Sequence, residues 1–115
     1  MQDIFCSIVS GEVPAEFVFR DESVVVFKDI HPQAPVHLLV VPVQHVDGVG
    51  DADNGTLGTL ISVAHRVARE QGLVDGYRLI VNDGKHGGKI VPHLHIHVLG
   101  GKPLGLKIVQ DTEAV

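Results

Sequence analysis

The amino-acid sequence predicts a single α+β domain over residues 1–115, with a mostly antiparallel five-stranded sheet, one long helix and a short N-terminal helix. Five short segments are rich in strand-forming residues and are separated by turn residues. One stretch shows sustained helical periodicity. Parallel β-α-β winding would need more crossover helices than this stretch provides. A chain of this length can bury one hydrophobic core.

Local residue types predict the N-terminal helix and the first two strands. Residues 1–9 can form a short helix or an extended lead-in, and Asp3 as N-cap with Gly11 as C-terminal stop favours the helix. Residues 17–20 and 24–28 combine β-branched and aromatic residues on either side of a polar turn. These two segments predict a hairpin.

The middle of the chain changes from strand to helix. Residues 30–35 contain two prolines and predict an irregular loop, and residues 37–41 predict the third strand. Asp53 or Asn54 is expected to cap the long helix, and Gly72 to end it. Its buried face should carry the apolar residues that recur at steps of three and four: Leu57, Leu60, Ile61, Ala64, Val67 and Ala68.

The last two strands flank a glycine-rich loop. Residues 78–82 predict the fourth strand, residues 83–89 the loop, and residues 92–99 the fifth strand, which Gly100 and Gly101 end. On the fifth strand three histidines alternate with three aliphatic residues. Because successive side chains on a strand point to opposite faces, we expect the imidazoles on one face and the aliphatic side chains against the helix.

The composition narrows the classes of function. The net charge is −5, the nine Lys and Arg residues are scattered, and aromatic residues are few, so a nucleic-acid partner is not expected. Neither a membrane-spanning run nor a secretory leader is recognisable in the sequence. The single cysteine fits a reducing compartment. We therefore expect a cytoplasmic protein that does not bind membranes.

The histidine face has three interpretations at this point: a solvated polar face, a zinc site or a nucleophilic site. Two histidines two residues apart can share a zinc ion, but the outer pair is about 13 Å apart along a strand, from the strand rise, and a third ligand would have to come from elsewhere. A neutral imidazole can also attack phosphorus. His95 is flanked by His93 and His97, and N–H groups of the loop at 84–89 can bind an anion. These features favour the nucleophilic site.

The segment 93–101 resembles the signature of the histidine triad superfamily, and its Leu-Gly-Gly ending resembles the nucleotide-binding branch, whose members are nucleoside phosphoramidases. The likeness covers nearly the whole chain: Asp3–Phe5, Gly11–Pro14, Asp29–Ile30, Pro32–His37, Gly76–Arg78 and Asn82. It implies a homodimer with a continuous ten-stranded sheet. It also implies hydrolysis of the P–N bond of purine nucleoside 5′-phosphoramidates, to AMP from an adenosine substrate, through a nucleotidyl-histidine and without a required metal or cofactor.

The same resemblance assigns roles to the polar residues. His95 corresponds to the nucleophile and His97 to a ligand of a phosphate oxygen. His93 corresponds to the histidine whose carbonyl holds the nucleophile, and His37 to the histidine that completes the cluster. Asn82 corresponds to a residue that hydrogen-bonds the phosphate or ribose.

The nucleoside is expected to lie against a second set of residues. Asp29 corresponds to the carboxylate that accepts both ribose hydroxyls. The walls around the base correspond to Ile4, Phe5, Phe27, Lys28 and Ile30, of which the apolar members could equally be core residues. Four other histidines have no family role and are expected on the surface: His31, His45, His65 and His86.

The sequence departs from the family pattern just before the triad, where it reads Gly88-Lys89-Ile90-Val91-Pro92. Some relatives have at the position of Ile90 a serine that binds the phosphate and can pass a proton to the leaving group. Ile90 offers its backbone N–H alone, while Lys89 adds a cation expected to help hold the phosphate. Pro92 removes one strand donor. A nucleotide-binding regulatory module with little catalysis is therefore the alternative function.

A second departure concerns metal. Some bacterial relatives carry Cys-x-x-Cys near the N-terminus, which forms a zinc site with two histidines. Asp3, Cys6, His45 and His93 stand at those four places here. A structural zinc is chemically possible with this set. A zinc-dependent enzyme is a further alternative, and it lacks a matched third ligand beside the His-x-His pair.

Overall fold

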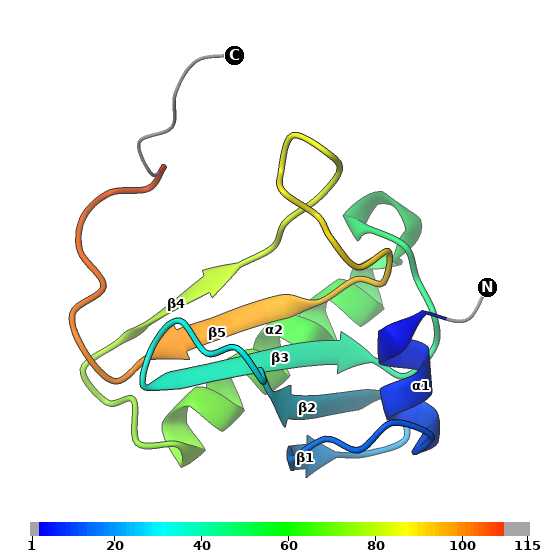
Figure 1. The fold of residues 1–115 in the computed structure, drawn as a ribbon, viewed down its shortest axis with the longest axis horizontal. Coiled ribbons are helices and arrows are strands. Elements are labelled where there is room, and N and C mark those ends of the chain that lie inside the picture. Colours follow the sequence, from blue (N-terminus) through cyan, green and yellow to red (C-terminus); the bar gives the residue numbers. More distant parts are fainter. Residues whose placement is uncertain (1–2, 110–115) are drawn as a thin grey trace.

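Five antiparallel strands form one sheet in the computed structural model, which describes residues 3–109 (Figure 1). The strand order is β1-β2-β3-β5-β4, and each pair of neighbours is antiparallel. The elements in chain order are α1 (Ile4–Ser10), β1 (Phe17–Arg20), β2 (Val24–Lys28), β3 (Val36–Pro42), the 3-10 helix η1 (Val49–Asp51), α2 (Asn54–Glu70), β4 (Tyr77–Ile80) and β5 (Ile96–Gly100). The predicted α+β class is confirmed.

The two faces of the sheet are covered differently. On one face α2 packs against alternate residues of the central strands, including Leu94, Ile96 and Val98 as predicted. On the other face α1 packs against the β2 and β3 end of the sheet through Phe5 and Ile8. Figure 1 shows α2 crossing behind the sheet and α1 at one end of it. None of the described helices covers the face opposite α2 over β3 and β5, and we call this the open face.

Side chains cap both helices at the predicted residues. The Asp3 carboxylate accepts from the Cys6 N–H at 2.8 Å, and Gly11 ends α1 with a left-handed φ of 87°. Asp53 caps α2 by accepting from the Thr56 N–H at 2.6 Å. Both helices start at these positions because a carboxylate accepts from an N–H group of the first turn that has no partner inside the helix.

The predicted buried face of α2 needs one correction. Leu60, Ala64, Val67 and Ala68 are buried, but Ile61 is 48% exposed. Ile61 directly follows Leu60, so it is rotated by about 100° from it around the helix axis and lies at the border of the apolar stripe. The short helix η1 was not predicted. No helix between residues 3 and 109 is long and apolar enough to cross a membrane.

Two strand boundaries differ from the prediction by two residues or more, and others by one. The fourth strand ends at Ile80 rather than at residue 82, and the fifth begins at Ile96 rather than at residue 92. Pro92 has no N–H to donate, and the Leu94 N–H donates to the Val46 carbonyl at 2.7 Å. The segment before β5 is thus bound to the loop after β3 instead of to a neighbouring strand. The side chains nevertheless keep the predicted alternation.

Candidate active site

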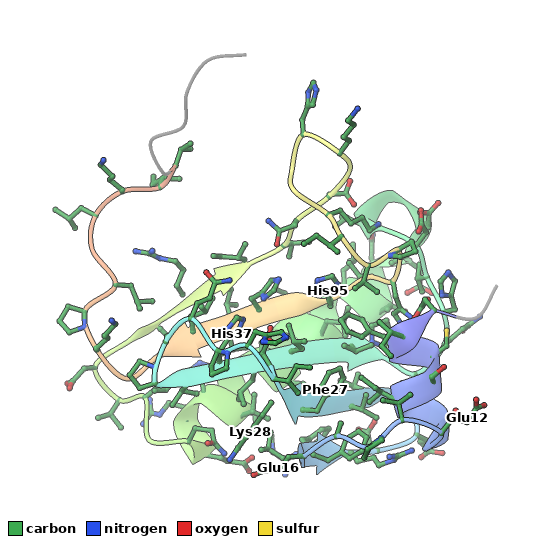
Figure 2. The ribbon with its side chains drawn as sticks, viewed as in Figure 1. Glu12, Glu16, Phe27, Lys28, His37 and His95 are labelled. Carbon is green, nitrogen blue, oxygen red and sulfur yellow. The ribbon has the colours of Figure 1, made fainter. Side chains whose placement is uncertain are left out.

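Three imidazoles meet on the open face of the sheet. Leu39 on β3 pairs with His97 on β5, and His37 lies two residues before Leu39, so both histidines point to the same face. His37 Nε2 is 2.9 Å from His97 Nδ1. The ring of His95 lies with its centroid 5.1 Å from that of His97. Figure 2 shows His37 and His95 over this face.

His95 is held as a neutral base with one free nitrogen. Its ring is buried, and Nδ1 lies 2.7 Å from the main-chain oxygen of His93. A carbonyl only accepts, so Nδ1 carries the proton and the lone pair is on Nε2. Burial lowers the pKa of His95. Phe5 supports the orientation, since its ring meets the imidazole edge-to-face with centroids 5.0 Å apart.

The tautomer of His97 follows from a chain of hydrogen bonds. The Gln33 N–H donates to His37 Nδ1 at 3.1 Å, so the proton of a neutral His37 is on Nε2. That proton is donated to His97 Nδ1, and His97 consequently carries its own proton on Nε2. Burial, followed by the neighbouring His95 and His37, lowers the pKa of His97 to about 4. His97 therefore presents a neutral N–H donor next to His95.

Asp29, His37 and His97 also place ligand atoms within 4.8 Å of one another. The Asp29 carboxylate is 3.4 Å from His37 Nε2, and its other oxygen accepts from the His31 N–H. A metal ion at this point would need the lone pair of His37 Nε2. The Gln33 N–H keeps a proton on that nitrogen, so this group is a hydrogen-bonded cluster and not a prepared metal site.

The glycine-rich loop is folded on itself. The N–H groups of Gly88 and Lys89 donate to carbonyls of Lys85 and Gly84, each at 3.1 Å. The Asn82 amide donates to the Gly87 carbonyl at 2.8 Å. These donors, expected to face the phosphate, are thus used within the loop in this conformation. The Ile90 side chain is 91% exposed.

The residues expected around the base differ in burial. Phe5 and Phe27 are buried and stack edge-to-face with centroids 5.5 Å apart. Ile4 and Ile30 are exposed, Ile30 to 82%. Lys28 is exposed and forms a 2.6 Å ion pair with Glu16, which Figure 2 labels beside it. The two phenylalanines belong to the core, and the two isoleucines are open to a ligand.

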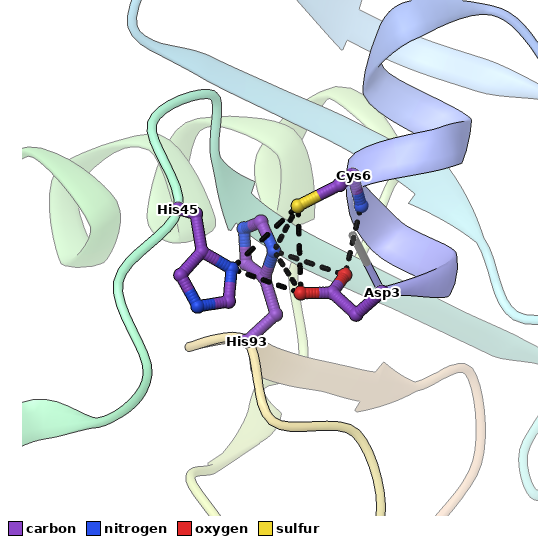
Figure 3. A group of neighbouring side chains, drawn as sticks. All are labelled: Asp3, Cys6, His45 and His93. Carbon is purple, nitrogen blue, oxygen red and sulfur yellow. Dashed lines mark hydrogen bonds and ion pairs between the residues drawn. The ribbon is translucent and has the colours of Figure 1, made fainter. Parts of the chain in front are cut away.

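A second cluster lies where α1 meets the segment before β5 (Figure 3). It consists of Asp3, Cys6, His45 and His93, whose ligand atoms all lie within 4.8 Å of one another. One Asp3 oxygen is 2.9 Å from His45 Nδ1 and 3.2 Å from His93 Nδ1. The Cys6 sulfur is 3.6 Å from both of these nitrogens. His45 is exposed, as expected, and also belongs to this cluster, whereas the exposed His31, His65 and His86 do not.

The charges in this cluster are unusual. His93 Nε2 donates to the Pro42 carbonyl at 3.0 Å, so in the neutral ring the Nδ1 lone pair points at the Asp3 carboxylate. Burial raises the pKa of Asp3, but the Cys6 N–H and the nearby His93 outweigh it, and the net pKa is lowered. The Asp3 carboxylate lies 3.2 Å from Nδ1 of the fully buried His93, and it also accepts from the Cys6 thiol at 3.4 Å.

Sequence reasoning missed the Gln33 N–H, which fixes the tautomers of His37 and His97. A main-chain donor leaves no residue-type signal, although the two prolines around Gln33 indicate a rigid loop. It also missed the contacts of the Lys89 ammonium, which donates to the Asp47 carbonyl. Those contacts depend on how two loops fold against each other.

A buried neutral imidazole, oriented by a main-chain carbonyl and placed beside an imidazole N–H donor, is the arrangement of a hydrolase with a histidine nucleophile. The order of strands and the single long helix place this site on an α+β sheet. The chain belongs to the HIT family, because the HIT domain family model matches residues 10–104.

Individual proteins agree with this assignment. The purine nucleoside phosphoramidase of Escherichia coli (strain K12) is 44% identical over 108 residues, with 90% of this chain and 91% of that protein covered. A HIT family hydrolase from Clostridium thermocellum superposes with a TM-score of 0.88 at 39% identity, covering 94% of this chain and 97% of that one. A Zn-bound histidine triad family protein from Mycobacterium smegmatis superposes with a TM-score of 0.81 at 35% identity, covering 96% and 83%. The chain is a hydrolase of this family.

Proposed function

We propose that the chain is a purine nucleoside phosphoramidase, which hydrolyses the P–N bond of a purine nucleoside 5′-phosphoramidate to the monophosphate and an amine. The observation that carries the proposal is the 2.7 Å hydrogen bond from His95 Nδ1 to the His93 carbonyl, which leaves a lone pair on Nε2. The 44% identity to the Escherichia coli phosphoramidase supports the choice of substrate class.

The reaction has two in-line steps. In the first, His95 Nε2 attacks phosphorus, the P–N bond breaks, and the amine leaves with a proton from solvent, because the Ile90 side chain has none to give. In the second, water attacks phosphorus, the bond to His95 breaks, and the water proton passes to solvent. His97 donates its Nε2 hydrogen to a phosphate oxygen in both steps, which stabilises the charge that develops there.

The rest of the substrate is bound by residues around the triad. Asp29 accepts the ribose hydroxyls, and Asn82 with the 88–90 segment borders the phosphate. The base lies against exposed Ile4 and Ile30. The set proposed to contact the substrate is Ile4, Phe5, Phe27, Lys28, Asp29, Ile30, Asn82, Gly88, Ile90, His95 and His97.

We also propose a homodimer with a continuous ten-stranded sheet. β4 is an edge strand, and an unpaired edge is open to pairing with a second copy. Ile80 at its end, Val81 after it and Ile61 on α2 are exposed apolar residues. Pairing of β4 and α2 with their copies would cover these side chains.

A structural zinc is the second part of the proposal. The cluster in Figure 3 offers two imidazole nitrogens, a thiolate and a carboxylate, a donor set that zinc accepts. The convergence of these four ligand atoms to within 4.8 Å of one another supports metal binding. Asp3, Cys6, His45 and His93 would hold the ion, which would fasten the start of α1 to the segment before β5. None of them supplies the nucleophile.

Turnover of a fluorogenic adenosine phosphoramidate tests the function, with wild type and His95→Ala measured with and without a chelator. We expect activity that the substitution abolishes and the chelator leaves in place. Loss with chelator alone would indicate a zinc enzyme. An inactive wild type that binds AMP tightly would instead support the regulatory binding module, the alternative that Ile90 favours.

A further inference from the structure

Lys89 joins two loops that border the segment leading to the triad. Its ammonium donates to the Asp47 carbonyl and lies 3.8 Å from the Asp47 carboxylate and 4.0 Å from that of Asp83. The side chain is only 13% exposed, although the loop that carries it is on the surface. Asp83 continues the connection by accepting from the Val49 N–H at 3.3 Å. The 83–89 loop is thus fastened to residues 47–49.

Gly48 shows how closely the two loops approach. A Cβ atom there would lie 2.6 Å from the Asp83 carboxylate oxygen and 3.1 Å from the Lys89 nitrogen. The backbone of Gly48 is extended, with φ near −149°, so any residue could adopt it. A side chain at this position would therefore displace the Asp83 carboxylate and crowd the Lys89 ammonium. Gly50, two residues on, has open space around it.

The Lys89 ammonium already has counter-charges. One carbonyl and two carboxylates surround it and hold it against the neighbouring loop. Its positive charge is one of the smaller causes that lower the pKa of His95. Removing its charge would leave the Asp47 and Asp83 carboxylates without the cation between them, and their repulsion would separate the loops.

We propose that Lys89 is a positioning residue, whose ammonium clips the 83–89 loop to residues 47–49 and so places Ile90 and the segment leading into His93–His97. It does not bind the substrate phosphate. This inference rests on the proposed phosphoramidase function, because the position it sets is that of the phosphate-bordering segment.

Single and double substitutions of Lys89 and Asp83 distinguish a positioning role of Lys89 from binding of the substrate phosphate. We expect Lys89→Met to lower kcat at least about tenfold, since a small displacement of a catalytic segment is costly. The double variant Lys89→Met/Asp83→Asn should recover most of the lost kcat, because the Asp47 carboxylate then no longer faces a second negative charge. Lys85→Met, on the same loop but exposed, should leave kcat unchanged. If Lys89 bound phosphate, Asp83→Asn alone would tighten AMP binding and the double variant would be as impaired as Lys89→Met; that result would overturn the proposal.

A steric pair tests the clip without changing any charge. Gly48→Ala should reproduce the loss of kcat and speed hydrogen exchange of the 84–90 amides, while Gly50→Ala should do neither. Equal kcat and equal hydrogen exchange in Gly48→Ala and Gly50→Ala would overturn the proposal that Lys89 fastens the two loops. Hydrogen exchange and thermal midpoints do not depend on catalysis, so they decide the clip even if the wild type cleaves no phosphoramidate. Failure of turnover alone would instead count against the proposed function.

Discussion

His37 gives its Nε2 hydrogen to His97 Nδ1 across 2.9 Å, because the Gln33 N–H occupies the other nitrogen of His37. The direction of this bond decides what His97 can offer a substrate. With Nδ1 accepting, His97 keeps its hydrogen on Nε2 and can donate it to a phosphate oxygen of the proposed substrate. A reversed bond would turn a lone pair towards a negatively charged group.

Removing His37 should therefore impair catalysis through His97. We expect His37→Ala to lower kcat about ten- to a hundredfold, in the range of a lost catalytic donor. His37→Gln, whose amide can still donate, should recover part of this. Nitrogen NMR of the His97 ring would show a mixed tautomer in His37→Ala. An unchanged Nε2–H tautomer in that variant would contradict the relay.

The depressed pKa of His97 predicts how stability depends on pH. Burial and the neighbouring His95 and His37 lower this pKa from 6.5 to about 4, against the opposing effect of Asp29. Between these values the unfolded chain binds the proton that the folded chain refuses, so the free energy of unfolding rises with pH from 4 to 6.5 and is flat above. Thermal midpoints measured across this window should rise less steeply in His97→Asn. Parallel curves would speak against a depressed pKa.

Phe27 and Ile30 are both proposed to contact the base, but their substitutions should have different effects on stability. Phe27 is 3% exposed, so Phe27→Ala should reduce the free energy of unfolding by about 3–5 kcal/mol. Ile30 is 82% exposed, so Ile30→Ala should change stability by less than about 0.5 kcal/mol. Urea unfolding measures the stability of the two variants, and calorimetry measures their affinity for AMP. Ile30→Ala should weaken AMP binding, and unchanged affinity would remove Ile30 from the site.

The proposed zinc predicts one ion per chain by elemental analysis. Asp3→Asn is the sharpest variant, because asparagine still caps α1 while the carboxylate ligand is lost. It should lose zinc and lower the thermal midpoint, with little effect on turnover while the chain stays folded. His86→Ala, on an exposed loop, should keep the metal. Equal zinc content in Asp3→Asn and wild type would exclude Asp3 as a ligand.

The fold could be predicted because each element except η1 has a local signal. Caps at Asp3 and Asp53, strand-forming runs and one helical period define the elements. Alternation predicted the faces of residues 93–98 even though β5 begins only at Ile96. Ile61 was misplaced because period alone does not say how wide the buried stripe is.

The site could be predicted less completely. The triad was located by its spacing, but the Gln33 donor and the Lys89 contacts arise from loop geometry. His45 is distant in sequence from Asp3 and Cys6, and its place in their cluster came from the family comparison alone. Contacts between loops have no periodicity, so pattern analysis cannot reach them.

The late start of β5 has a consequence for His95, the proposed nucleophile. Inside a ladder, the carbonyl of His93 would be directed at a neighbouring strand and used for sheet pairing. Since pairing begins only at Ile96, that oxygen is available to the ring two residues further along its own chain. The group that orients His95, the proposed nucleophile, is thus a main-chain carbonyl that the sheet has left unused. A substitution that lengthens β5 towards Pro92 would compete with the His95 ring for this acceptor.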